Sequence, residues 1–222
     1  MIRTLYYKEW IKVRAYYLLA SIVSFAFTLY SLLRVYRVVG MKGAGHLWEV
    51  MIAKDVIFID YLQYLPLVVG LAMAVVQFAP EMYHKSLKLT LHLPFSAERV
   101  TFAMLSAGFG LLVLLFAANV ALLYLGLLPR FALELVDHIV LTSVTWFLAG
   151  IAAYFLAAWI VLEPTWRMRV AGGLVSILTL RIFFLSTTPE AYNGFLPLLS
   201  LITILLSLFS WLSVERFKAG KQ

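Results

Sequence analysis

The 222-residue chain contains no cysteine, which excludes disulfide bonds and thiolate metal sites. It is also poor in charge, since Asp, Glu, Lys and Arg make up only 13% of its residues, whereas 64% are hydrophobic. Soluble domains carry roughly a quarter charged residues, so the composition indicates an integral membrane protein. The net charge of +7 comes from basic residues that flank apolar stretches, which is typical of orientation in a bilayer and not of nucleic-acid binding.

Catalytic and nucleotide-binding motifs are missing as well. The Gly-x-x-x-x-Gly-Lys-[Ser/Thr] pattern of a phosphate-binding loop does not occur. The histidines are not spaced as metal ligands, and no nucleophile, base and acid form a hydrolytic pattern. Residues 1–14 are too polar for a cleavable signal peptide. We therefore expect no enzyme activity, no metal and no cofactor in this chain.

Long apolar runs are what the chain has instead. A helix needs about 20 apolar residues to cross the hydrocarbon core, and only helices or closed barrels can cross it. No alternation of period two appears, so we expect helices. Uncharged runs cover 15–33, 61–79, 100–129, 139–162 and 191–214, and a further run over 170–189 is interrupted only by Arg181. The sequence predicts an all-α polytopic membrane protein with six spans in a single transmembrane domain over 1–222.

The distribution of basic residues predicts how these spans are oriented. Most of the 18 Lys and Arg residues fall in the two termini, in segment 80–99 and between the fourth and fifth spans. Cytoplasmic segments carry an excess of these residues. Both termini and segment 80–99 are therefore expected in the cytoplasm, and the protein is expected to be a multi-pass protein of the inner (cytoplasmic) membrane.

Residues 1–14 predict an amphipathic helix that lies along the cytoplasmic membrane surface ahead of the first span. At 100° per residue, one side holds the apolar residues Ile2, Leu5, Tyr6, Trp10 and Val13. Lys8 and Lys12 fall on one flank. Glu9 projects into the apolar side, which is costly unless its carboxylate is paired. A juxtamembrane anchor and a contact between subunits both fit this pattern.

Segment 80–99 is a polar connection between the second and third spans. Its centre is compatible with a short helix, which Pro94 would end. Ser96 is expected to cap the third span. The short helix would present three side chains to solvent, Lys85, Lys88 and His92. By charge alone, a solvated cytoplasmic loop is the better explanation of the segment.

Three polar side chains fall inside the predicted spans. Arg181 lies near the middle of the fifth span, where a charge must face a carboxylate, another helix or a wet cavity. An alternative is that the span is shifted and Arg181 lies near the outer surface; Glu134, Asp137 and Glu190 near the outer ends could neutralise it. Gln77 and Asn119 are expected to hydrogen-bond between helices or to line a substrate path.

The pattern as a whole resembles the permease subunits of type 2 ABC exporters. Their stretch between helices two and three approximates Glu-x-x-x-Gly-Thr-Leu-Glu-x-Leu-Leu-x-x-Pro-x-Ser-Arg. Here Glu81 matches the leading acid, and Ser86-Leu87, Leu89, Pro94 and Ser96 match later positions, while Lys8-Glu9 match a Lys-Glu pair near the N-terminus. The chain departs from the family at Lys85, where the family has glycine, and at Lys88, where it has an acid.

The resemblance implies a role for each of these segments. Segment 80–99 would form a coupling helix that docks on an ATPase, through Glu81, His84, Lys85, Ser86, Lys88, His92, Pro94 and Ser96. The N-terminal helix would contribute Lys8, Glu9, Trp10 and Lys12.

The resemblance also implies partners: two ABC ATPase subunits that carry ATP and Mg²⁺, a second permease chain, identical or homologous, and the lipid bilayer. The alternative function is a non-transporting scaffold or sensor whose basic loop binds an acidic partner.

Overall fold

The computed structural model describes residues 2–42, 59–83, 96–186, 188 and 190–219. All regular structure in these ranges is helical, which confirms the predicted fold class. The α-helices are α1 (Ile2–Lys42), α3 (Leu65–Tyr83), α5 (Ala97–Leu127), α6 (Leu133–Leu162), α7 (Trp166–Ile182), α8 (Leu196–Leu205) and α9 (Ser207–Lys218). Short 3-10 turns, η1 (Asp60–Leu62) and η2 (Asn193–Phe195), precede α3 and α8.

Five helical segments of the described chain are long and apolar enough to cross a membrane, whereas the sequence predicted six. They are Arg3–Met41, Asp60–Tyr83, Ala97–Leu127, Leu133–Leu162 and Asn193–Lys218. The predicted span over 170–189 is wrong in its bounds, because α7 starts earlier and ends at Ile182 after 17 residues. At 1.5 Å per residue this helix is about 26 Å long, which is shorter than the hydrocarbon core of about 30 Å. The Tyr192 hydroxyl donates to the Ile182 carbonyl at 2.9 Å and so occupies the end of α7.

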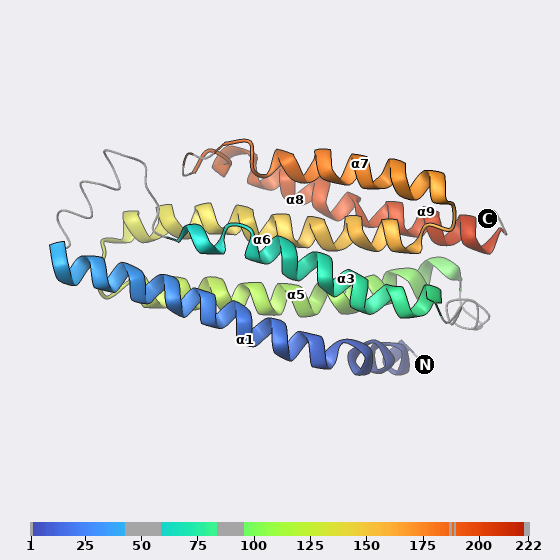
Figure 1. Cartoon of the computed structure of the whole chain (residues 1–222), viewed down its shortest axis with the longest axis horizontal. Coiled ribbons are helices and arrows are strands. Elements are labelled where there is room, and N and C mark those ends of the chain that lie inside the picture. Colours follow the sequence, from blue (N-terminus) through green and yellow to red (C-terminus); the bar gives the residue numbers. More distant parts are fainter. Residues whose placement is uncertain (1, 43–58, 84–95, 187, 189, 220–222) are drawn as a thin grey trace.

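The N-terminal part of the chain also differs from the prediction. No break separates a surface helix over 1–14 from a first span over 15–33, since α1 runs continuously from Ile2 to Lys42. Figure 1 shows the first turns of α1 more nearly end-on than the rest, so the helix bends near its N-terminus. Helix α1 extends past the predicted end at Leu33 because apolar residues continue there at helical spacing.

The helices form an elongated bundle in which α6 is the central element (Figure 1). Helix α6 contacts α3, α5, α7, α8 and α9, and α1 packs on α3 and α5. The backbones of α3 and α6 approach closely at Gly70 and Gly150: a Cβ atom at Gly150 would lie 2.5 Å from the Pro66 carbonyl oxygen. Small residues permit such approaches between membrane helices, which gain no hydrophobic driving force from contact with one another.

Both ends of the described chain lie at the same end of the bundle (Figure 1). The end of α3, the start of α5 and the α6–α7 connection lie there too. Which side of the membrane this end of the bundle faces stays a prediction. Large apolar side chains such as Leu18, Leu174 and Leu178 are exposed on the outside of the bundle, as expected for contact with lipid.

Candidate functional site

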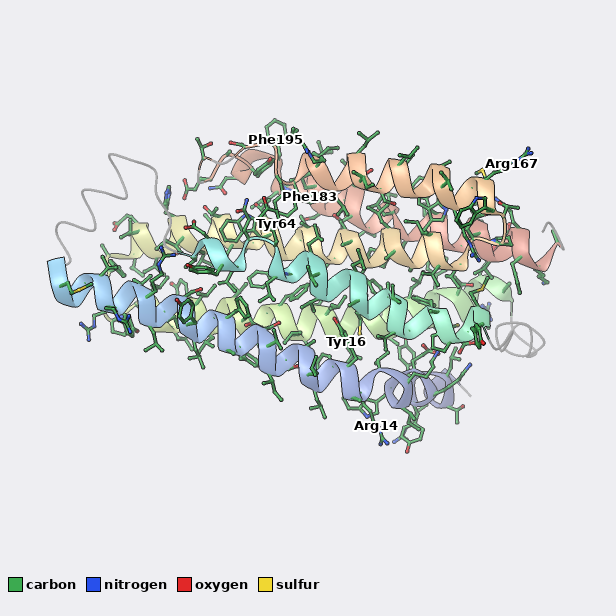
Figure 2. All side chains as sticks on the ribbon, in the orientation of Figure 1. Arg14, Tyr16, Tyr64, Arg167, Phe183 and Phe195 are labelled. Carbon is green, nitrogen blue, oxygen red and sulfur yellow. The ribbon has the colours of Figure 1, made fainter. Side chains whose placement is uncertain are left out.

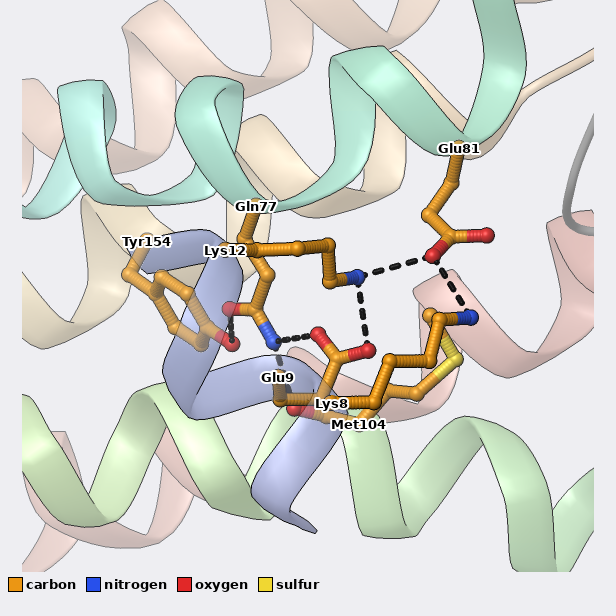
Figure 3. Close-up of polar contacts among 7 residues, drawn as sticks. All are labelled: Lys8, Glu9, Lys12, Gln77, Glu81, Met104 and Tyr154. Atoms are coloured by element: carbon orange, nitrogen blue, oxygen red, sulfur yellow. Dashed lines mark hydrogen bonds and ion pairs between the residues drawn. The ribbon is translucent and has the colours of Figure 1, made fainter. Parts of the chain in front are cut away.

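Four charged side chains meet where the first turns of α1 cross the end of α3 (Figure 3). The Lys12 ammonium lies 2.6 Å from Oε1 of Glu9 and 2.8 Å from Oε1 of Glu81. The Lys8 ammonium lies 2.9 Å from the same Glu81 oxygen. Lys12 therefore bridges one carboxylate of its own helix to one carboxylate of α3. We refer to Lys8, Glu9, Lys12 and Glu81 as the charge cluster.

Helical spacing explains why each helix presents these groups on one side. Lys8 and Lys12 are four residues apart on α1, and Gln77 and Glu81 are four residues apart on α3. Side chains at this spacing lie one above the other on the same helix face. These polar side chains therefore meet where the two helices cross.

The Gln77 side chain extends the charge cluster to α5 and α6. Its amide nitrogen donates to Oε2 of Glu9 at 2.9 Å and to the Met104 carbonyl of α5 at 2.8 Å. The Tyr154 hydroxyl of α6 donates to Oε1 of Gln77 at 2.8 Å. Gly108 of α5 leaves the space for this contact, because a Cβ atom there would meet the side-chain oxygens of both Gln77 and Tyr154. One connected network thus joins four helices.

Burial determines how strongly these charges depend on each other. The side chains of Glu9 and Glu81 are 1% and 2% exposed, whereas those of Lys12 and Lys8 are 19% and 40% exposed. A buried carboxylate is costly unless it is paired and hydrogen-bonded. Each carboxylate here has a lysine partner, so the cluster is electrically balanced. The expectation that Glu9 needs a partner is confirmed.

The charge cluster combines two carboxylates with two ammonium groups, and ammonium groups are not metal ligands. In the part of the chain that the structure describes, no three His, Asp or Glu side chains are grouped so that they could hold a metal. The charge cluster is therefore suited to holding helices together, and its carboxylates are already paired.

The structure places the predicted coupling residues in different environments. Glu81 lies within α3, which continues to Tyr83, and is buried against α1, so the first residues of segment 80–99 belong to the helix and not to a polar connection. Ser96 caps α5 as predicted, and its hydroxyl accepts from the Arg99 backbone N–H at 3.5 Å. The remaining coupling residues, His84, Lys85, Ser86, Lys88, His92 and Pro94, lie outside the described residues.

The predicted apolar side of the first turns of α1 is divided between the protein interior and the outside, because Leu5 packs against the core while two aromatic residues of the same side are exposed. Tyr6 and Trp10 are 41% and 38% exposed, whereas Glu9 and Val13 are buried. Trp10 contacts Tyr17 of the same helix, ring edge to face, with centroids 5.9 Å apart. The outward position of these aromatic rings fits the headgroup level of a membrane, where such rings are enriched. Glu9 turns inward because its polar partners, Lys12 and Gln77, lie there.

The three polar residues proposed for a substrate path do not come together. Asn119 is buried and accepts from the Thr28 hydroxyl at 2.7 Å, which joins α5 to α1. Gln77 belongs to the network around the charge cluster. Arg181 lies in the last turn of α7 and is exposed, so its predicted position in the middle of a span is wrong. Glu190 pairs with His138 at 3.1 Å.

A third buried carboxylate lies at the same end of the bundle. Glu163 follows α6 and accepts from the Ser213 hydroxyl at 2.5 Å, from the Thr165 hydroxyl at 2.8 Å and from the Arg216 guanidinium at 3.0 Å. Burial alone would raise the pKa of Glu163, but these hydrogen bonds and the Arg216 charge hold its pKa below 4.5. Glu163 therefore ties the end of α6 to α9.

Comparison of the chain with protein-family models, with curated proteins and with solved structures found no match. The resemblance to type 2 ABC exporter permeases therefore stays a prediction.

The ion pairs at this end of the bundle can transmit movement from one helix to another. Two of the three buried carboxylates, Glu81 and Glu163, fix the ends of α3 and α6 to α1 and α9 respectively, at the end of the bundle where α5 begins. A force applied to the end of α3 would reach α1 through the charge cluster, and α5 and α6 through Gln77.

Proposed function

We propose that the chain is the membrane-spanning permease subunit of an ATP-driven ABC exporter. A separate ATPase, in two copies with ATP and Mg²⁺, would supply the energy, and a second permease chain, identical or homologous, would complete the path through the inner membrane. The chain itself has no phosphate-binding loop and would carry out no catalysis.

The observation that carries this proposal is the bridge from Lys12 to Glu81. Glu81 stands three residues before segment 84–95, which contains most of the residues that match the coupling stretch of the family. A displacement of that segment would move the end of α3. The ion pair between Lys12 and Glu81 would transmit this movement to α1. The membrane helices would then shift as packed units between two arrangements, as helices and domains do in transport and switching proteins.

The polar network gives this movement a route to the rest of the bundle. Gln77 contacts Glu9, the Met104 carbonyl and Tyr154, so α1, α3, α5 and α6 are held by one set of hydrogen bonds. A two-state arrangement requires groups that repack as a unit and not a continuously deformable surface. Ion pairs and amide hydrogen bonds in an apolar bundle meet that requirement, because each is costly to leave unmade.

Co-purification from native membranes tests the proposal. The tagged chain is expected to bring down a protein that contains a phosphate-binding loop and hydrolyses ATP. Charge reversal at Lys85 and Lys88 is expected to release that protein or to lower its ATP turnover. Charge reversal at Arg167 and Lys218, two exposed basic residues at the same end of the bundle, serves as the matched control and is expected to leave both unchanged.

The proposal loses its basis if no ATPase accompanies the chain, or if both pairs of reversals have the same effect. Capture of an acidic cytosolic protein without a phosphate-binding loop would instead favour the scaffold or sensor function.

A further inference from the structure

Toward the end of the bundle opposite the charge cluster, a pocket lies between the start of α3 and the end of α7. Its volume is about 520 Å³, and it is lined by Tyr64, Leu67, Ile177, Leu180, Arg181 and Phe184. Pockets that bind small molecules have volumes of about 300–1,000 Å³ and are mostly apolar with a few polar groups. This pocket has five aliphatic or aromatic residues and one cation.

The aromatic wall of the pocket is formed by residues from both sides. The Tyr64 and Phe184 rings are stacked with centroids 5.1 Å apart and an interplanar angle of 28°. Figure 2 shows Tyr64 at the start of α3 beside the end of α7, where Phe183 is labelled. Stacking fixes the two rings in position, so the pocket has a firm apolar wall next to the guanidinium of Arg181.

The charge of Arg181 is uncompensated in the described part of the chain. There the Arg181 guanidinium forms no ion pair and no hydrogen bond, whereas two other arginines toward the same end, Arg34 and Arg130, have partners. Arg34 lies over the Tyr61 ring at 5.0 Å and faces Asp60 at 3.9 Å, and Arg130 lies over the Tyr36 ring at 5.3 Å. A cation at the edge of a bilayer is stabilised by pairing with an anion. The planar guanidinium can form bidentate hydrogen bonds with phosphate or carboxylate oxygens.

We propose that this pocket binds an anionic amphiphile, that is, a molecule with a phosphate or carboxylate headgroup on an alkyl chain. The headgroup would pair with Arg181, and the chain would lie along Leu67, Ile177 and Leu180 against the stacked rings. A purely apolar ligand would leave the guanidinium unpaired, and a free inorganic anion would leave the apolar wall unused. The site goes beyond the proposed transport function, because binding requires no ATPase.

Binding to the purified full chain in an uncharged detergent tests this site. Native mass spectrometry would follow titration with phosphatidylglycerol, with phosphatidylcholine of the same chain length, and with dodecyl phosphate. We expect saturable binding of an anionic ligand and weaker binding of phosphatidylcholine. Arg181→Gln is expected to weaken anionic binding about tenfold or more, the usual effect of removing a charged hydrogen-bond partner, and to leave phosphatidylcholine unchanged.

The matched control is Arg37→Gln, which removes an exposed arginine of α1 toward the same end of the bundle and outside the pocket; it is expected to bind all ligands as the unmodified chain does. Tyr64→Ala removes the apolar wall and keeps the cation, so it should weaken binding of every chain-bearing ligand. Unchanged thermal unfolding of Arg181→Gln would show that the variant is folded.

The remaining outcomes separate the sources of the ligand. Phosphatidylglycerol that displaces dodecyl phosphate supports a bilayer lipid, and binding of dodecyl phosphate alone supports a single-chain amphiphile. Three results would overturn the proposal: displacement of the amphiphile by inorganic phosphate, equal binding of phosphatidylcholine and phosphatidylglycerol, or equal losses for Arg181→Gln and Arg37→Gln.

Discussion

Replacement of Lys12 by methionine is the sharpest test of the charge cluster. Methionine keeps most of the length of the lysine side chain and removes only the ammonium group. Glu9 would then keep the Gln77 amide as its polar contact, and Glu81 would keep Lys8. Because both carboxylates are almost fully buried, the change leaves a charge of α1 close to a charge of α3 without the cation between them.

The size of the effect follows from burial. Breaking a buried ion pair by removing one partner costs about 3–5 kcal/mol. A chain of this length shifts its Tm by about 2–4 °C per kcal/mol, so Lys12→Met should lower Tm by roughly 6–20 °C. Lys8 has the same charge and contacts the same Glu81 oxygen, but its side chain is 40% exposed. Exposed pairs contribute about 0.2–1 kcal/mol, so Lys8→Met should lower Tm by less than about 4 °C.

Thermal unfolding of the purified chain in detergent, followed by tryptophan fluorescence, measures these shifts. The decisive variant combines Lys12→Met with Glu9→Gln and Glu81→Gln, which removes both stranded charges and keeps hydrogen-bonding side chains. This triple variant should recover most of the lost stability, because the main cost is an uncompensated buried charge. Equal losses for Lys8→Met and Lys12→Met, or a triple variant as unstable as Lys12→Met alone, would refute the reasoning.

Two further predictions concern packing and pH. Gly70→Leu should lower Tm by roughly 2–12 °C, because the added side chain collides with the α6 backbone, whereas Gly173→Leu, with open space around it, should change Tm little; equal shifts would contradict the packing. Glu163→Gln should lower Tm at about pH 7. The lowered pKa of Glu163 means that its ionised form stabilises the fold fully above about pH 4.5, and this contribution is lost as the pH falls through the lowered value. The difference in Tm between the two proteins should therefore shrink below about pH 4.5, and a constant difference would contradict the prediction.

The lengths of apolar runs were enough to predict a helical membrane protein, but not where every helix ends. The run over 170–189 looked like a span, yet its helix ends at Ile182, where contacts with Tyr192 take over. Periodicity placed Lys8 and Lys12 on one flank of α1. Periodicity could not show which face packs inward, because that depends on Glu81 of another helix. Tyr154 lies in an uncharged run, and nothing in its sequence context indicates that its hydroxyl donates to Gln77.

The charge cluster also explains how α1 keeps its register in the bundle. Contact between apolar helix faces gains no hydrophobic energy in lipid, so polar contacts contribute to the choice of register. A shift of α1 along its axis would break its polar contacts with the neighbouring helices. Lys12 holds α1 to Glu81 of α3, and Thr28, about 24 Å further along the helix, holds it to Asn119 of α5. Two fixed points on different helices set both the height and the rotation of α1, so a shift of the end of α3 must move α1 with it or break a buried ion pair.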